Sequence, residues 1–117
     1  PTRGGLATVL NEIAIQAGLG VEVEERLIPV SAVVKGACDM LGMDPLYMAN
    51  EGKMVIFAGR EDIADIMQEL CKNPTTQGAK IIGEVVDNHP GMVLLQTELG
   101  AKRILSMLEG EHVPRIC

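Results

Sequence analysis

Aromatic residues are almost absent from this 117-residue sequence, which has no tryptophan, one tyrosine and one phenylalanine. A hydrophobic core must therefore be built from aliphatic side chains and from the seven methionines, whose flexible side chains fill irregular gaps. Proteins that bind single-stranded nucleic acid commonly stack the bases on aromatic rings. The composition therefore argues against a nucleic-acid partner that is bound in this way.

Basic charge is also scarce. Ten lysines and arginines stand against sixteen aspartates and glutamates, and the net charge of -6 has the wrong sign for binding nucleic acid or an anionic membrane through overall electrostatics. The apolar stretches are well short of the roughly 20 residues of a membrane span, and no basic-then-apolar signal peptide is visible. We therefore expect a cytoplasmic protein that binds neither nucleic acid nor membrane.

Three cysteines, an odd number with wide spacing, fit neither a disulfide framework nor a Cys-x-x-Cys metal site. Cys38 falls on an apolar helix face, so we interpret it as a small core residue, and Cys71 falls at a helix end, where we interpret it as structural or incidental. Cys117 ends a polar segment, where an accessible thiol is avoided unless it is used, so we expect it to be the reactive group.

His89 and His112 have no accompanying ligands; we predict no metal site and place both on the surface.

The spacing of apolar residues predicts one α+β domain over residues 1–108. We expect three helices and four extended segments, the helices lying over one sheet: helices at 6–17, 33–41 and 61–72, and extended segments at 21–23, 80–86, 92–97 and 101–107. Residues 109–117 have no periodicity, so we expect a mobile tail there. The chain begins at Pro1 without a methionine, which suggests a part of a longer protein.

The segment Thr2-Arg3-Gly4-Gly5 stands immediately before the first predicted helix. Backbone N–H groups freed by the glycines, a hydroxyl and a guanidinium would then lie at the positive end of that helix, where they could cradle a phosphate. The alternative is a helix entry that contains glycines and a solvent-exposed arginine. These residues alone leave both interpretations open.

The segment Asn50-Glu51-Gly52-Lys53 is a polar turn between the apolar runs 46–48 and 54–58. A carboxylate between an amide and a lysine, beside a glycine that permits unusual backbone angles, can place a general base next to a ligand. The alternative is a hairpin-like turn with solvated charges. The apolar flanks favour the first interpretation, because flanking strands would hold the carboxylate rigidly.

Taken together, residues 1–5, 49–53 and 114–117 resemble the C-terminal half of the HypE family of hydrogenase expression/formation proteins. Residues 82–86 and 100–103 are also similar to that family, and the resemblance covers the entire chain. The terminal Pro-Arg-Ile-Cys is its most specific part, because the other motifs recur in loosely similar form in the wider aminoimidazole-ribonucleotide-synthetase-like superfamily. The resemblance implies that superfamily's PurM-like C-terminal domain, an α/β/α layered structure with a mixed sheet.

The resemblance also implies a function in [NiFe]-hydrogenase maturation. In the HypE family the carbamoyltransferase HypF carbamoylates the sulfur of the C-terminal cysteine, and ATP activates the carboxamide oxygen. Loss of that oxygen leaves a thiocyanate, whose cyanide is passed with the HypC–HypD pair to the hydrogenase iron. Cys117 matches the carrier and Glu51 the proposed base. The residues that match the ATP-phosphate motif, or lie in the same turn as Glu51, are Thr2, Arg3, Gly4, Gly5, Asn50 and Lys53.

The sequence departs from the family because it does not include the family's first domain. In the family that domain supplies most of the nucleotide pocket, the metal-binding acids and the dimer contacts, so we expect ATP and Mg²⁺ to bind mainly through it. We also expect the full-length protein to be a homodimer and this chain alone to be inactive. Two alternatives stay open. One is a non-catalytic interaction domain; the other is a superfamily enzyme that uses ATP on a selenium or purine substrate.

Overall fold

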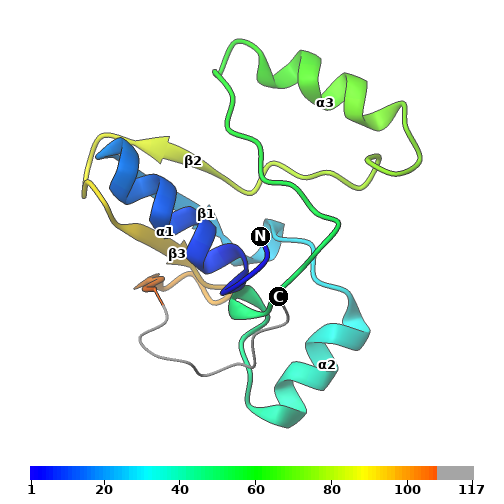
Figure 1. Ribbon diagram of the computed structural model, residues 1–117, viewed down its shortest axis with the longest axis vertical. Coiled ribbons are helices and arrows are strands. Elements are labelled where there is room, and N and C mark those ends of the chain that lie inside the picture. Colours follow the sequence, from blue (N-terminus) through cyan, green and yellow to red (C-terminus); the bar gives the residue numbers. More distant parts are fainter. Residues whose placement is uncertain (108–117) are drawn as a thin grey trace.

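A four-stranded mixed sheet forms the centre of the molecule (Figure 1). The computed structural model describes residues 1–107, so Cys117, His112 and the tail predicted over residues 109–117 lie outside the described residues. The elements are, in order, α1 (Gly5–Ala17), β1 (Gly20–Glu24), η1 (Glu25–Leu27), α2 (Ala32–Leu41), η2 (Pro45–Tyr47), α3 (Ile63–Cys71), β2 (Gly83–Val86), β3 (Val93–Gln96) and β4 (Lys102–Ile104).

The strand order is β2-β1-β3-β4, with β1 parallel to β3 and antiparallel to β2, and with β4 antiparallel to β3. Strand β1 alternates as its sequence predicts: Val21 and Val23 are buried, whereas Glu22 and Glu24 face the other side. The parallel register pairs Val21 with Val93 and Val23 with Leu95. The mixed sheet with helices expected from the sequence is therefore confirmed.

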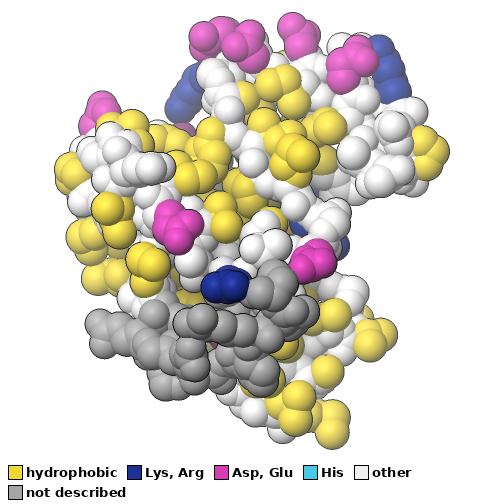
Figure 2. All heavy atoms as spheres, viewed as in Figure 1, with side chains coloured by type: hydrophobic (Ala, Val, Ile, Leu, Met, Phe, Trp, Pro, Cys, Tyr) yellow, Lys and Arg dark blue, Asp and Glu magenta, His cyan; other side chains and the backbone are white. Residues whose placement is uncertain are grey.

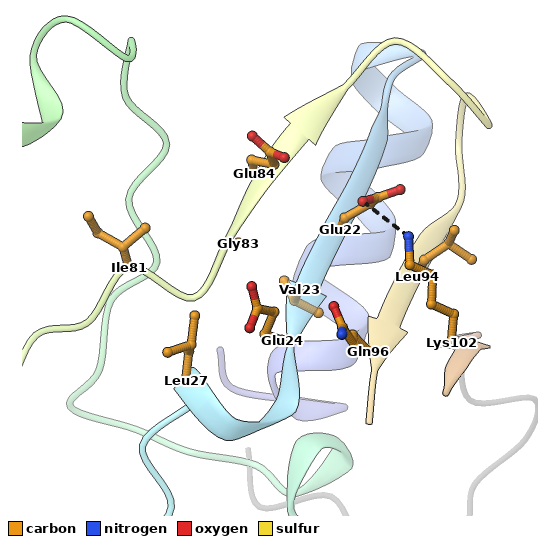
Figure 3. A pocket seen from close by; sticks show the side chains of 10 residues that line it. All are labelled: Glu22, Val23, Glu24, Leu27, Ile81, Gly83, Glu84, Leu94, Gln96 and Lys102. Atoms are coloured by element: carbon orange, nitrogen blue, oxygen red, sulfur yellow. Dashed lines mark ion pairs between the residues drawn. The ribbon is translucent and has the colours of Figure 1, made fainter. Parts of the chain in front are cut away.

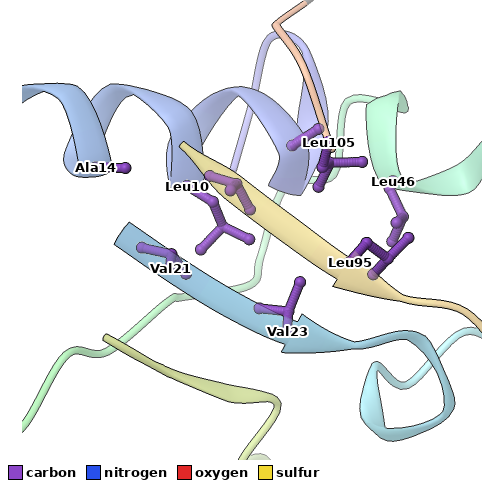
Figure 4. Packing of buried hydrophobic residues seen from close by; sticks show 9 residues of the cluster. Leu10, Ala14, Val21, Val23, Leu46, Leu95 and Leu105 are labelled. Carbon is purple, nitrogen blue, oxygen red and sulfur yellow. The ribbon is translucent and has the colours of Figure 1, made fainter. Parts of the chain in front are cut away.

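Helix α1 covers one face of this sheet and supplies a third of the core residues (Figure 4). Leu10 lies between the valines of β1 and the leucines at the other end of the cluster. The predicted helix and its stop at Gly18 are confirmed, and the helix begins one residue earlier than predicted, at Gly5. The core residues are Ala7, Leu10, Ala14, Val21, Val23, Leu46, Val93, Leu95 and Leu105.

Helix α2 forms where the sequence predicts it, with the hydroxyl of Ser31 accepting a hydrogen bond from the Val34 N–H and with Gly42 at its end. Cys38 is buried as expected, yet most of the apolar face is not: Met40 is 90% exposed and Val33 83%. Figure 2 shows hydrophobic side chains gathered over α2 at the lower right. Because α1 already covers the short sheet, the apolar face of α2 stays largely exposed. The presence of this helix was predictable from sequence, but its degree of burial was not.

Helix α3 lies away from the sheet, at the top of Figure 1. Its acidic side chains line the upper edge in Figure 2. None of its residues is fully buried, although its apolar residues follow the helical spacing that the sequence shows. Within residues 1–107, no helix combines the length and the apolarity that crossing a membrane requires.

The expectation that strands flank the polar turn at residues 50–53 is wrong. The chain makes the short helix η2 and then runs without helix or strand to residue 62. Pro45 begins η2, and the Asp44 carboxylate accepts a hydrogen bond from the Leu46 N–H, so these residues favour a helical turn over a strand. The N–H of Asn50 is bonded to the carbonyl of Pro1 and takes no part in a hairpin.

Gly5 allows α1 to lie directly on the backbone of η2, so we predict that Gly5→Ala destabilises the protein more than Gly18→Ala does. Both glycines have φ in the left-handed region, 62° and 66°, where a side chain costs about 1–2 kcal/mol. A Cβ at Gly5 would also lie 2.5 Å from the Leu46 and Met48 carbonyl oxygens, whereas nothing lies within 4 Å at Gly18.

The clash should add about 1–3 kcal/mol to the loss at Gly5, the usual cost of forcing an atom into a packed region. Urea unfolding of the two variants and the wild type measures the difference. Equal losses in the two variants would show that the contact between α1 and η2 is not tight.

Candidate functional site

The structure brings two of the three motifs singled out in the sequence into contact. The N–H of Asn50 donates to the Pro1 carbonyl over 3.0 Å, and Gly5 packs on the backbone of residues 46–48. Thr2 and Arg3 follow Pro1 directly, and Glu51 follows Asn50. Thr2 and Arg3, which carry the hydroxyl and the guanidinium, and Glu51, which carries the carboxylate, therefore all lie next to this one hydrogen bond along the chain.

The two glycines of the first motif turn the chain tightly into α1. Both have left-handed φ angles, 69° at Gly4 and 62° at Gly5. The N–H of Gly5 donates to the Thr2 carbonyl over 3.3 Å, so this N–H is already used inside the turn. The groups that the turn presents at the surface are the side chains of Thr2 and Arg3, which are exposed beside the positive end of α1.

The second motif is equally accessible. The side chains of Asn50, Glu51 and Lys53 are exposed, and Gly52 has a left-handed φ of 74° that sharpens the turn. A guanidinium beside a helix N-terminus suits an anionic phosphate, and a carboxylate in the adjoining turn can accept protons. No cluster of three or more metal-ligating side chains occurs in the described part of the chain.

The end of the described chain is held beside the same segment. Leu105 is fully buried, and its N–H donates to the Val93 carbonyl. The buried amide of Asn11 donates to the carbonyls of Leu105, over 2.7 Å, and Ala7, over 2.8 Å. The hydroxyl of Tyr47 donates to the Ser106 carbonyl over 2.7 Å.

Sequence reasoning missed Asn11 and Tyr47, although each carried a signal. Asn11 is the polar residue inside the apolar stripe of α1, and a buried amide needs hydrogen-bond partners. Tyr47 is the one tyrosine of the sequence, and a half-buried tyrosine usually finds a partner for its hydroxyl.

Cys117, the third motif, lies outside the described residues. It is ten residues beyond Met107, and ten residues span at most ~36 Å. The described domain measures 39 × 35 × 33 Å. A segment of ten residues is therefore not too short for the Cys117 thiol to reach the site at residues 1–5 and 50–53.

A second polar cluster lies on the sheet face that points away from α1 (Figure 3). Glu22 accepts from His89 Nε2 over 3.2 Å and pairs with Lys102 over 3.8 Å. The surface position expected for His89 is wrong, because its side chain is only 16% exposed. Its ring fits because Gly20 has no side chain: a Cβ there would lie 2.5 Å from the imidazole.

This cluster borders an open cavity of about 240 Å³ that contains none of the predicted site residues. Its three carboxylates are already paired, Glu22 with Lys102, Glu24 with Arg26 and Glu84 with Arg60. A neutralised, open cavity offers a ligand little electrostatic attraction. The cavity therefore does not coincide with the predicted site, whose two motifs meet at the hydrogen bond between Asn50 and Pro1.

Comparison with known proteins agrees with the motifs. The family described as AIR synthase related protein, C-terminal domain, matches residues 1–113. The carbamoyl dehydratase HypE of Rhodobacter capsulatus is 46% identical over 116 residues, which are 99% of this chain and 34% of that protein. The resemblance recognised in the sequence is thus confirmed.

Solved structures agree as well. A crystal structure of the hydrogenase maturation protein HypE in complex with ATP matches 100% of this chain and 36% of its own, with a TM-score of 0.91 and 43% identity. A HypE–HypF complex matches 92% of this chain and 35% of its own, with a TM-score of 0.85 and 38% identity. The chain thus spans about a third of the length of the proteins it matches.

We predict that Asn11→Ala lowers the free energy of unfolding by about 1–3 kcal/mol, because it leaves the buried Leu105 carbonyl without its side-chain donor. Chemical denaturation measures the loss. Gln16→Ala, an exposed change on the same helix, is the matched control and should shift stability by less than about 0.5 kcal/mol. Equal stability of the two variants would contradict the anchoring role of Asn11.

Proposed function

The chain belongs to the AIR synthase related protein C-terminal domain family, and from this we propose that it acts in [NiFe]-hydrogenase maturation as part of a carbamoyl dehydratase. The relative that is 46% identical over 99% of this chain is named carbamoyl dehydratase HypE, and this name supports the proposal. The single observation that carries the proposed site is the hydrogen bond between Asn50 and Pro1, which joins the two motifs.

In the proposed reaction Cys117 is the carrier. Its sulfur bears a carbamoyl group, –S–C(=O)NH₂, which loses its oxygen and both amide protons to become a thiocyanate, –S–C≡N. An amide oxygen is a very poor leaving group, and ATP supplies the phosphoryl group that lets it leave as phosphate, with ADP as the other product. One proton stays on the phosphate and one goes to solvent. The S–CN bond then breaks to return the Cys117 thiolate and give cyanide to the hydrogenase iron, a step that takes up two electrons, which we assign to a reductant on the acceptor side, the HypC–HypD pair.

Glu51 is the proposed base that takes the amide protons as the C≡N bond forms. Its exposed position in the turn leaves it open to a substrate, and Asn50 beside it is fixed to the first motif. Arg3 and Lys53 would bind phosphate oxygens, with the Thr2 hydroxyl as a further donor. Gly4 and Gly5 let the backbone of the turn stay close to the ligand and to η2.

ATP as a substrate is supported by the similarity to an ATP complex of HypE. Mg²⁺ stays a prediction, and we place its ligands in the first domain. The carbamoyltransferase HypF is the proposed donor enzyme, supported by the similar HypE–HypF complex. The HypC–HypD pair as acceptor, the full-length homodimer and the cytoplasmic location stay predictions from the sequence.

A non-catalytic interaction domain is the second candidate. The exposed apolar face of α2, where Val33, Met40 and Leu41 are more than two-thirds exposed, favours it, because such patches mark contact surfaces. A contact surface is also compatible with the enzyme, which needs partners. The terminal Pro-Arg-Ile-Cys argues against a superfamily enzyme for selenium or purine substrates.

We predict that Glu51→Gln in the full-length protein lets the carbamoyl form of Cys117 accumulate, because the amide cannot accept the protons. A lost general base slows such a step by about 10²–10⁴-fold. Mass spectrometry of the terminal peptide, after incubation with the carbamoyltransferase, carbamoyl phosphate and ATP, separates the carbamoyl and cyano forms. Glu61→Gln, an exposed change ten residues away, is the control and should behave as wild type.

Normal thiocyanate formation in Glu51→Gln would remove Glu51 from the role of base. A carbamoyl group found outside the terminal peptide would remove Cys117 from the role of carrier. Full hydrogenase maturation after deletion of residues 114–117 would favour the interaction domain.

We also predict that the 117-residue chain binds Mg-ATP no more tightly than about 1 mM by calorimetry. The two exposed cationic side chains of the proposed site, Arg3 and Lys53, contribute about 1 kcal/mol each, and a millimolar Kd needs ~4 kcal/mol. The full-length protein, measured in parallel, should bind much more tightly because most of the pocket lies in its first domain. Tight binding by the short chain would overturn this division of the site.

A further inference from the structure

Two contacts join η2 and the residue before it, Asp44, to β4 and to the residues that follow β4. Asp44 Oδ2 pairs with Arg103 Nη2 over 3.0 Å, and the Tyr47 hydroxyl donates to the Ser106 carbonyl over 2.7 Å. The two contacts, called the clamp below, lie on either side of the buried Leu105. They tie together segments that are 59 residues apart in the sequence.

The clamp lies close to the proposed base. Glu51 is four residues after Tyr47, and the chain from residue 48 to residue 62 forms no helix or strand that could hold it. Two anchors lie just before Glu51 in the chain: η2 ends at Tyr47, and the Asn50 N–H is bonded to the Pro1 carbonyl. We expect a shift of η2 to change the position of the turn that carries Glu51, because that turn begins where η2 ends.

The clamp contributes little to the stability of the fold. Its ion pair is partly exposed, 44% at Arg103 and 33% at Asp44, and exposed pairs are weak and screened by salt. Leu46, which precedes Tyr47, is already buried in the core. The contacts are therefore better suited to fixing the orientation of η2 than to keeping the domain folded.

We propose that the clamp positions Glu51, and that Tyr47 is a positioning residue for the dehydration step. This inference rests on the proposed function. Tyr47 does not touch the reacting atoms; its hydroxyl holds η2 against Ser106, and η2 sets where the turn with Glu51 begins.

The clamp also holds Ser106, near the start of the segment that ends in Cys117, but this effect is smaller. Releasing Ser106 would lengthen the segment that carries Cys117 from about eleven to about twelve residues, and the effective concentration of a tethered group falls as roughly the 3/2 power of length, or about 1.1-fold. Misplacing a catalytic group by about 1 Å can cost up to a hundredfold. The effect on Glu51 therefore dominates.

The test uses Tyr47→Phe, which removes only the hydroxyl, in the full-length protein. The carbamoyltransferase should load Cys117 at the wild-type rate, whereas single-turnover conversion of the carbamoyl to the cyano form should slow by on the order of tenfold. The melting temperature should stay within a few degrees of wild type. Lys35→Gln, which breaks the exposed Lys35–Glu98 pair elsewhere, is the matched control and should change neither step.

The decisive measurement combines Tyr47→Phe with Glu51→Gln. If Tyr47 acts through Glu51, the hydroxyl should have no further effect once the carboxylate is gone, so the double variant should convert as slowly as Glu51→Gln alone. A further tenfold loss in the double variant would show that Tyr47 acts independently and would overturn the proposal. Equal slowing of loading and conversion in Tyr47→Phe would overturn it too, as a general structural defect.

Arg103→Gln opens the clamp from its other side and keeps the proposal testable if Tyr47→Phe does not fold. It should slow conversion, by less than Tyr47→Phe does, and leave loading unchanged. Unchanged conversion in both folded variants would overturn the positioning role while the dehydratase function stands. A wild-type protein that loads Cys117 but never forms the cyano product would instead overturn the proposed function, and with it this inference.

Discussion

The close approach of α1 to the backbone of η2 is the constraint on which the rest of the structure depends. Gly5 makes it possible, because any side chain there would collide with the Leu46 and Met48 carbonyls. With α1 resting on η2, Leu46 completes the core and the Asn50 N–H meets the Pro1 carbonyl. One packing contact thus both closes the core and brings together the two motifs of the proposed site.

The same short helix links stability to function. On one side η2 is anchored in the core through Leu46, and on the other it is held by Asp44 and Tyr47 to the chain that leads toward Cys117. The turn with Glu51 follows without helix or strand, so its position depends on these anchors. An irregular segment can be accurately placed when the ends that hold it are rigid.

The described chain divides into a packed part and an open part. The sheet, α1 and η2 form the core, whereas α2 leaves much of its apolar surface exposed, α3 has no fully buried residue, and the site residues lie at the surface. Such a domain is suited to work with other domains and proteins. The proposed chemistry has the same requirement, since a carbamoyl donor, a nucleotide and a cyanide acceptor must all meet one thiol.

The sequence by itself determined the helices, the strands and the family, because apolar spacing, caps such as Ser31 and terminal motifs are local and can be read in order along the chain. It also marked Thr2, Arg3 and Glu51 as candidates. Only the tertiary structure decided that α2 stays largely exposed, that η2 replaces a hairpin, that His89 is half-buried, and that Asn11 and Tyr47 hold the end of the described chain. The contacts of His89, Asn11 and Tyr47 cross 59 to 94 residues, and no local pattern specifies which distant group will meet a given side chain.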